Sequence, residues 1–261
     1  MKTKIEVLGI SKKFGDHQVL RDVSLKVKEG ENLVIIGSSG GGKTVLLKHI
    51  IGLLKPDSGK ILIDGEEVTD KDGFGLKPLR KKFGMVFQSS ALFNSLTVAE
   101  NIGLGPREAR IYTEKEIKEI VEEKLQLVGL EGIGDLMPEE LSGGMKKRVA
   151  LARSLAMNPE IILYDEPTSE LDPPTAHTIN QLILNLKEKL KVTSVTVTHD
   201  INCAYFIGDR IAMLHEGKII KVATPEEIRA SCDPIVGQFL TRDEWKKGCP
   251  GSPGLTERND A

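Results

Sequence analysis

The sequence lacks any apolar run long enough to cross a membrane as a helix. Its longest apolar pieces, such as residues 33–36, have the length of a strand, whereas a spanning helix needs roughly 18 apolar residues. The N-terminus also lacks the apolar region of a secretory signal peptide, because Glu6 falls inside the stretch that would have to form it. We therefore expect a protein that neither spans a membrane nor is secreted by that route.

Cysteine is scarce, and so is net charge of either sign. The three cysteines, Cys203, Cys232 and Cys249, are odd in number and have no C-x-x-C spacing, which favours reduced thiols in a cytosolic protein and argues against a metal site. The 36 Lys plus Arg residues balance 38 Asp plus Glu residues, so we expect no nucleic-acid partner. With 261 residues, 39% hydrophobic and 28% charged, the composition is that of a globular protein with a well-buried core.

Strand-like and helical stretches alternate along the chain. Apolar patterning predicts strands at residues 4–8, 19–27, 33–36, 60–68, 161–164 and 193–197. It predicts helices at residues 43–54, 113–130 and 176–189. This alternation predicts an α/β fold with a mostly parallel sheet flanked by helices, into which a mainly helical segment, residues 90–155, is inserted. Residues 243–261 lack apolar periodicity, and we expect a flexible C-terminal tail there.

A glycine-rich segment lies between the predicted strand at 33–36 and the helix that follows. Residues 37–44 satisfy the P-loop pattern G-x-x-x-x-G-K-S/T. Glycines let the backbone wrap closely around phosphate groups, so that successive N–H groups and the helix N-terminus point at the anion. Lys43 would reach the β- and γ-phosphates, and Thr44 would offer its hydroxyl to Mg²⁺. The predicted nucleotide-binding residues here are Gly37, Ser38, Ser39, Gly40, Gly41, Gly42, Lys43, Thr44 and Val45.

Two acidic residues follow the predicted strand at 161–164. Asp165 is placed to hold Mg²⁺ directly or through a water molecule, and Glu166 to polarise the attacking water as a general base. Such a segment taken alone could be a solvated acidic turn. Together with a P-loop, it predicts the metal-binding and water-orienting part of an ATP site.

A third segment resembles a family signature. Residues 141–145 read Leu-Ser-Gly-Gly-Met, which is similar to the signature of ATP-binding-cassette (ABC) ATPases. Ser142 with the two glycines is typical of a cap that opens a helix, which would be a second anion-binding terminus. In ABC ATPases the signature of one subunit closes over the γ-phosphate bound to the other. The resemblance therefore implies a head-to-tail homodimer enclosing two ATP molecules, with Ser142, Gly143, Gly144 and Met145 in contact with the nucleotide.

The resemblance also implies the fold and the domain organisation. It indicates a P-loop NTPase with a RecA-like mixed or parallel sheet, an antiparallel β subdomain and an inserted helical signature subdomain. Residues 1–242 would form this nucleotide-binding domain, with the helical subdomain at about 90–155 and the tail at 243–261.

Further segments match ABC motifs in order. Phe14 resembles the aromatic residue that stacks on adenine, although it could equally be a core phenylalanine. Gln88 resembles the Q-loop glutamine that senses Mg²⁺ and water, residues 169–172 resemble the D-loop, and His199 resembles the switch histidine at the γ-phosphate. The resemblance thus implies catalytic roles for Lys43, Gln88, Glu166 and His199, and a magnesium site of Thr44, Gln88 and Asp165. The remaining histidines, His17, His49, His177 and His215, have no such context and are assigned no role.

Two residues depart from the family pattern. Met145 replaces the usual glutamine of the signature, which puts a hydrogen bond to the partner's ribose in doubt but not the phosphate contacts. Glu170 places an acid where the D-loop usually carries a small residue, and so adds negative charge near the dimer seam.

Residues 42–47, 91–98 and 136–148 look like the phospholipid-trafficking branch of the family, the Mla-type or organic-solvent-resistance ATPases. That resemblance implies a cytoplasmic subunit, peripheral on the cytoplasmic face of the inner membrane. It would drive an integral membrane permease that moves phospholipid between membranes, together with a substrate-binding subunit of the mammalian-cell-entry (MCE) type.

The region after the Q-loop contacts the coupling helix of the membrane subunit in such transporters. Leu92, Phe93 and Leu96 would suit an apolar groove for that helix, or they could pack within the helical subdomain. The Lys-Lys-Arg run at 146–148 is interpreted as a solvated helix face rather than a patch for lipid headgroups.

Three alternatives remain open at this point. An importer ATPase for amino acids or ions shares every catalytic motif and differs in its permease. A soluble, non-transport ABC ATPase of the iron–sulfur-assembly type predicts scaffold partners and no membrane association. A GTP-dependent switch is disfavoured, because the chain contains no N-K-x-D motif and its signature segment would be unexplained.

Overall fold

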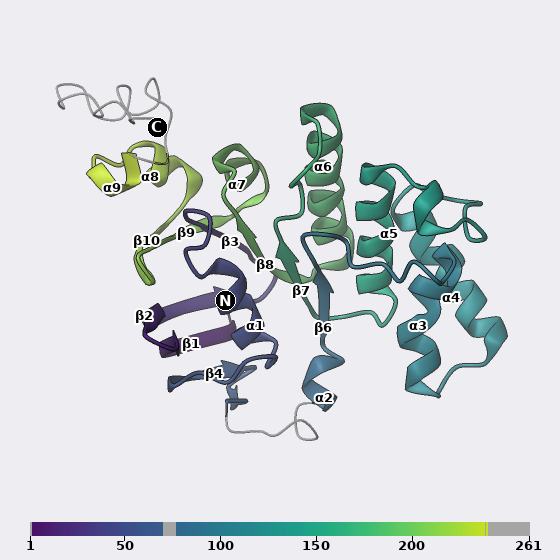
Figure 1. Cartoon of the computed structure of the whole chain (residues 1–261), viewed down its shortest axis with the longest axis horizontal. Helices are drawn as coiled ribbons and strands as arrows, with labels where there is room; N and C mark the ends of the chain where they lie inside the picture. Colours follow the sequence, from purple (N-terminus) through teal and green to yellow (C-terminus); the bar gives the residue numbers. More distant parts are fainter. Residues whose placement is uncertain (1, 70–76, 238, 240–261) are drawn as a thin grey trace.

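A six-stranded sheet forms the centre of the computed structural model, which describes residues 2–69, 77–237 and 239 (Figure 1). Its strand order is β10-β9-β3-β8-β7-β6. The strands are β3 (Asn32–Ile36), β6 (Phe83–Val86), β7 (Ile161–Asp165), β8 (Thr193–Thr198), β9 (Arg210–His215) and β10 (Lys218–Ala223). The strands from β9 to β6 pair in parallel, and β10 joins β9 antiparallel. Every residue of β3, β7 and β8 is buried, as expected for parallel strands that are covered on both faces.

A second, antiparallel sheet covers one face of the central sheet. Its order is β2-β1-β4-β5, made of β1 (Thr3–Phe14), β2 (His17–Lys28), β4 (Ser58–Ile63) and β5 (Glu66–Glu67). Leu33 and Ile35 of β3 share a buried cluster with this sheet and with α1 (Lys43–Ile50), whereas Val34 and Ile36 belong to the cluster on the opposite face. This alternation follows from the two-residue period of a strand. The predicted mixed sheet with an antiparallel β subdomain is confirmed.

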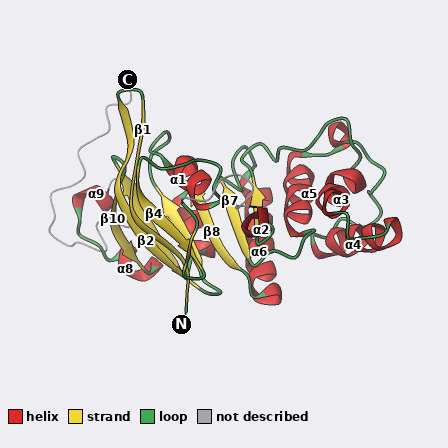
Figure 2. Ribbon diagram, turned by 90° about the horizontal axis from the view of Figure 1, so that it is seen from below, coloured by secondary structure: helices red, strands yellow, loops and turns green. Residues whose placement is uncertain are grey.

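Helices cover the other face and extend the molecule beyond the sheet. These helices are α6 (Pro173–Leu190) and α7 (Ile201–Ile207), together with α3 (Val98–Ala109), α4 (Glu114–Leu127) and α5 (Gly143–Leu155). The last three lie between β6 and β7 in the sequence, and Figure 2 shows them grouped at one end of the molecule. Short helical turns complete the chain at α2 (Lys77–Arg80), η1 (Pro138–Glu140), α8 (Pro225–Arg229) and α9 (Pro234–Gly237). None of the described helices is long and apolar enough to span a bilayer.

Helix ends follow local capping chemistry. Thr97 and Thr113 each form a capping box with a glutamate three residues later, which fixes the starts of α3 and α4. The helix predicted at 43–54 ends earlier, at Ile50, because the chain turns at Gly52, whose φ is 70°. The domain bounds of the sequence analysis stay a prediction, and the predicted tail at 243–261 lies outside the described residues.

The cysteines differ in state. Cys203 is a buried free thiol that donates to Asn180 at 3.2 Å, and burial raises the pKa of this thiol to about 12. Cys232 is disulfide-bonded, so the prediction of three reduced thiols is wrong at this residue. Spacing along the chain shows which cysteines are not close neighbours in sequence, but not which side chains meet in space. Cys249 lies outside the described residues.

A buried asparagine fastens the segment that leads into α3. Asn101 has no exposed surface. Its Oδ1 accepts from the N–H of Phe93 at 2.8 Å, and its Nδ2 lies within 3.1 Å of the carbonyl oxygens of Phe93, Leu96 and Thr97. One side chain therefore holds the loop formed by residues 93–97 in a single conformation.

We expect Asn101→Ala to lower the free energy of unfolding by about 3 kcal/mol, since several buried polar groups lose their partner. Urea unfolding of the two proteins measures this difference. Asn94→Ala, at an exposed position in the same loop, is the matched control and should change stability by less than about 0.5 kcal/mol. Equal losses in both variants would contradict the role of Asn101.

Candidate active site

A cleft of about 390 Å³ lies over the N-terminal end of α1. It is lined by Phe14, His17, Val19, Ser39, Gly40, Gly41, Gly42, Lys43, Thr44, Val45, Gln88, Glu166 and His199. The fold thus brings together predicted residues that are separated by up to 185 positions, from Phe14 to His199. Asp165 lies beside the cleft through its bond to Thr44, whereas the signature residues 142–145 are not part of its lining.

The floor of the cleft is backbone. Gly40 and Gly42 have φ values of 74° and 95°, in the left-handed region that favours glycine. A Cβ at Gly42 would also lie 3.0 Å from side-chain atoms of Val19 and Leu20. No side chain caps the N-terminus of α1, so its first-turn N–H groups have no side-chain acceptor. Such a helix end is suited to phosphate oxygens, because the N–H groups and the helix dipole both favour negative charge.

Lys43 lies buried beside this floor. Its Nζ donates to the carbonyl oxygens of Gly37 at 2.9 Å and Ser38 at 3.0 Å, and lies 3.6 Å from Oε1 of Glu166. Burial lowers the pKa of Lys43, and the nearby Glu166 carboxylate opposes that shift. A buried ammonium group that is only partly neutralised by one carboxylate favours a further anion in the cleft.

Two oxygen-bearing side chains meet where α1 begins and β7 ends. The hydroxyl of Thr44 donates to Oδ1 of Asp165 at 2.8 Å, and Asp165 is buried. Burial raises the pKa of Asp165, and the Thr44 hydrogen bond opposes the shift. A divalent cation would offset the cost of this buried charge, and hydroxyl and carboxylate oxygens are ligands that Mg²⁺ prefers. These residues therefore fit a magnesium ion, and the exposed Gln88, which follows β6, lines the same cleft.

Glu166 is held at both its backbone and its carboxylate. Its N–H donates to the carbonyl oxygen of Val197 at 2.9 Å. Its Oε2 accepts from the Thr198 hydroxyl at 3.1 Å and the His199 N–H at 3.3 Å, and lies 3.0 Å from Nδ1 of His199. The φ of Glu166 is 48°, a left-handed conformation that costs energy for a residue with a Cβ and recurs at functional sites. The carboxylate is thus fixed in a position from which it can orient water and accept a proton.

The signature segment opens α5 as predicted. Ser142 is the N-cap, and its Oγ accepts from the N–H of Met145 at 3.3 Å. Gly144 is required for packing, because a Cβ there would lie 2.6 Å from Cγ2 of Thr175 on α6. The prediction that Ser142 caps a helix is confirmed, and this helix N-terminus lies outside the cleft of its own chain.

The β1–β2 hairpin contributes the predicted Phe14 and two residues that sequence patterns did not indicate, His17 and Val19. His17, which was assigned no role, pairs with Phe14 across the hairpin and lines the cleft. Phe14 is 48% exposed, and Nζ of Lys12 lies 5.6 Å from its ring centroid, so it is not a core phenylalanine. The pairing of the two strands, rather than any motif, places His17 there.

The Lys-Lys-Arg run at 146–148 in α5 is less exposed than predicted. Lys146 and Arg148 are partly exposed, but Lys147 is 4% exposed. The interpretation of residues 146–148 as a solvated helix face is therefore wrong at Lys147. Successive helix positions point about 100° apart, so one residue of a charged run can face inward.

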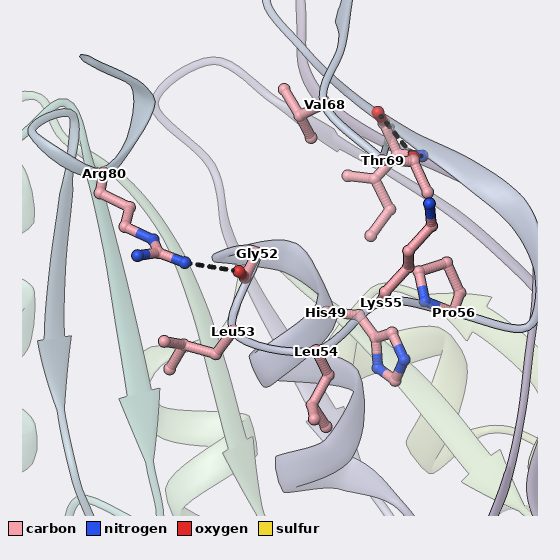
Figure 3. A pocket seen from close by; sticks show the side chains of 10 residues that line it. His49, Gly52, Leu53, Leu54, Lys55, Pro56, Val68, Thr69 and Arg80 are labelled. Atoms are coloured by element: carbon pink, nitrogen blue, oxygen red, sulfur yellow. Dashed lines mark hydrogen bonds between the residues drawn. The ribbon is translucent and has the colours of Figure 1, made fainter. Parts of the chain in front are cut away.

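A smaller cavity of about 240 Å³ lies near the opposite end of α1 (Figure 3). His49, Leu54 and Val68 contribute to its lining, and Arg80 donates from Nη2 to the carbonyl oxygen of Gly52 at 2.8 Å. No residue predicted to bind nucleotide lines it. Of these two pockets in the described part of the chain, only the larger cleft is lined by residues predicted to bind phosphate.

Comparison with known proteins agrees with this geometry. The sequence matches the ABC transporter family over residues 20–169. This chain belongs to the ABC transporter family. It binds ATP and is an ATPase whose hydrolysis is coupled to transport, and its P-loop NTPase fold is confirmed.

Individual relatives align with this ABC protein over most of its length. The intermembrane phospholipid transport system ATP-binding protein MlaF of Haemophilus influenzae is 42% identical, over 90% of this chain and 89% of that protein. The probable ribonucleotide transport ATP-binding protein mkl of Mycobacterium leprae is also 42% identical, over 100% of this chain and 74% of that protein. A dimeric post-hydrolysis structure of the ATP-binding cassette MJ0796 with ADP and Pi has a TM-score of 0.78 at 38% identity, covering 85% of this chain and 98% of that one.

The contact between Gly144 and Thr175 gives a stability prediction. Gly144→Ala should lower the free energy of unfolding by roughly 2 kcal/mol, because α5 and α6 must separate to make room for the methyl group. Thr175→Ser removes Cγ2 but keeps the hydroxyl that donates to Asp172 at 2.7 Å. The double variant should therefore recover much of the loss in urea unfolding, and a double variant no more stable than Gly144→Ala would contradict the steric explanation.

Proposed function

We propose that this ABC ATPase works as a head-to-tail homodimer with Mg²⁺ and powers the movement of phospholipid between membranes. The observation that carries the ATPase part is the convergence of Lys43, Thr44, Gln88, Glu166 and His199 on one cleft with a glycine-rich floor. Support for phospholipid as cargo comes from the 42% identity to MlaF, which extends over 89% of that protein.

The proposed chemistry is attack of water on the γ-phosphorus of ATP. Glu166 would orient the water and accept its proton while the bond between the γ-phosphorus and the bridging oxygen breaks, giving ADP and phosphate. Lys43 and the first-turn N–H groups of α1 would stabilise charge on the phosphates, with His199 placed at the γ-phosphate. Thr44, Asp165 and Gln88 would hold Mg²⁺, which supplies further charge neutralisation when bound.

Dimerisation would complete the site. The cleft of one chain contains a P-loop and the general base but not the signature residues, whose helix N-terminus remains available for a second nucleotide. In the proposed homodimer, Ser142, Gly143 and Gly144 of each chain close over the γ-phosphate of the other. Met145, which is partly buried against the core, would contact the nucleotide without the hydrogen bond that a glutamine offers.

A groove of about 520 Å³ lies close to the Q-loop. Phe93, which is 52% exposed, lines it together with Met85, Phe87, Leu104 and Met157. Leu92 is instead partly buried and packs against the main core. Of the two alternatives for this segment, Phe93 thus follows the one in which it lines a groove, and Leu92 the one in which it packs inward. Arg153 supports the wall by donating to the carbonyl oxygens of Ala91 at 2.7 Å and Ser90 at 2.9 Å.

We propose that this groove receives an apolar coupling helix of the permease. Gln88 lines the ATP cleft, and its neighbours Phe87 and Ala91 line the groove. Motion of the coupling helix in the groove would therefore reach the site of hydrolysis. The permease, with an MCE-type substrate-binding subunit, would place this chain at the cytoplasmic face of the inner membrane.

Glu166→Gln should reduce ATP hydrolysis by roughly 100-fold or more, because an amide cannot accept the proton of the attacking water. ATP binding should persist, and the variant should accumulate as an ATP-bound dimer in size-exclusion chromatography. Glu119→Gln, on the surface of α4, serves as the control for charge removal. Hydrolysis near the wild-type rate in Glu166→Gln would remove Glu166 from its role.

Phe93→Asp should abolish copurification of the permease in mild detergent, since a buried unpaired charge in the groove is costly to desolvate. Ile111→Asp is the matched control, because Ile111 is 67% exposed but lies outside the groove. Protein and lipid mass spectrometry of the wild-type complex identifies the partners and cargo.

Recovery of a permease, an MCE-type partner and phospholipid supports the proposal. A permease with a receptor for polar solutes would replace the cargo with amino acids or ions. Recovery of soluble assembly proteins alone, without any membrane subunit, would overturn the transport proposal in favour of the iron–sulfur-assembly alternative.

A further inference from the structure

We propose that Lys147 is a positioning residue that links the signature helix to the general base of the same subunit. This role of Lys147 rests on the proposed function, because it assumes that Glu166 orients water and that the signature contacts the partner's nucleotide. Through this link, engagement of the signature in one ATP site would adjust the catalytic centre of the other.

The side chain of Lys147 reaches from α5 into the junction of three functional segments. Its Nζ donates to the carbonyl oxygen of Gln88 in the Q-loop. It also lies 3.4 Å from the carbonyl oxygen of Glu166 and 3.4 Å from Oγ of Ser169 in the D-loop. One ammonium group, 4% exposed, therefore contacts the Q-loop, the residue proposed as general base and the D-loop at once.

A buried lysine is stable only when its charge and its donors are compensated. The three acceptors match the three donors of an ammonium group. Burial lowers the pKa of Lys147, and the carboxylates of Glu170, Glu166 and Asp165 oppose that shift. Glu170 is the departure in the D-loop, so its added negative charge has a counterpart within its own chain.

The contact with Glu166 falls on a residue whose backbone is in the left-handed region. Glu166 has a φ of 48°, and its carbonyl oxygen also accepts from the Ser169 hydroxyl at 2.9 Å and the Ser169 N–H at 3.2 Å. These bonds close a turn that keeps the left-handed residue in place. Lys147 adds a charged donor from outside the turn, so the position of α5 bears directly on the conformation of Glu166.

The signature and Lys147 belong to one rigid helix. Ser142 caps α5 and Lys147 lies five residues later, about 8 Å along the axis. A rotation of α5 that accompanies closure of Ser142 over a nucleotide would move the ammonium group relative to Gln88 and Glu166. Two ATP sites of a head-to-tail dimer would then be coupled through α5.

The test compares Lys147→Met, Lys147→Arg and Lys147→Gln with Lys146→Met, a neighbouring control that is partly exposed. Steady-state ATP hydrolysis is measured on the full chain in complex with its permease. Lys147→Met should lower kcat at least about tenfold with KM changed less than about threefold, and its Hill coefficient for ATP should fall toward 1. Lys147→Arg should retain more activity than Lys147→Met, and Lys146→Met should match the wild type.

Hydrogen exchange of the nucleotide-free chain tests the link independently of activity. Amides of residues 88–90 and of Glu166, Thr168 and Ser169 should exchange faster in Lys147→Met, or in Lys147→Gln if the methionine variant does not fold, but not in Lys146→Met. Unchanged exchange there, or wild-type kcat and Hill coefficient in Lys147→Met, would overturn the proposal. A wild-type chain without ATPase activity would instead refute the proposed function, while exchange would still decide the role of Lys147.

Discussion

The active site depends on the parallel arrangement of four neighbouring strands, whose carboxyl ends meet at one edge of the central sheet. The P-loop follows β3, Asp165 ends β7 and Glu166 comes next, His199 follows β8 and Gln88 follows β6. The register fixes their relative heights, with Ile36 opposite Thr198 and Asp165 opposite Val197. Binding sites of open α/β sheets lie at this edge, because loops there can diverge while the strands below stay fixed.

Buried groups compensate one another's charge only in part in this site. Lys43 lies 3.6 Å from the carboxylate of Glu166, Lys147 lies 3.4 Å from its backbone carbonyl oxygen, and Asp165 is paired with the hydroxyl of Thr44. The lysines are buried and the pKa of each is lowered by that burial, so both gain from additional negative charge nearby. A nearby cation would likewise stabilise the ionised carboxylate of Asp165. Mg²⁺ and phosphate would therefore supply the compensating charge that these buried groups lack.

Short, local patterns in the sequence predicted much of the fold and most of the cleft. The P-loop needs glycine at positions with positive φ, and the hydroxyl of Ser142 bonds to an N–H only three residues later. Both features can therefore be recognised from a few consecutive residues. His17 and Lys147 left none, because their positions follow from strand pairing and from helix packing between distant segments. The bond at Cys232 escaped prediction for the same reason. Long-range contacts set these features, and single-sequence patterns do not contain them.

The loop fastened by Asn101 has a consequence for the assembly of transporters. Since the backbone of residues 93–97 is already ordered by buried hydrogen bonds, a partner does not have to order it on arrival. Its exposed side chains can then change one at a time without disturbing the ATP cleft. In the proposed complex, such a surface would allow the permease contacts to vary while the ATP-hydrolysing chemistry stays the same.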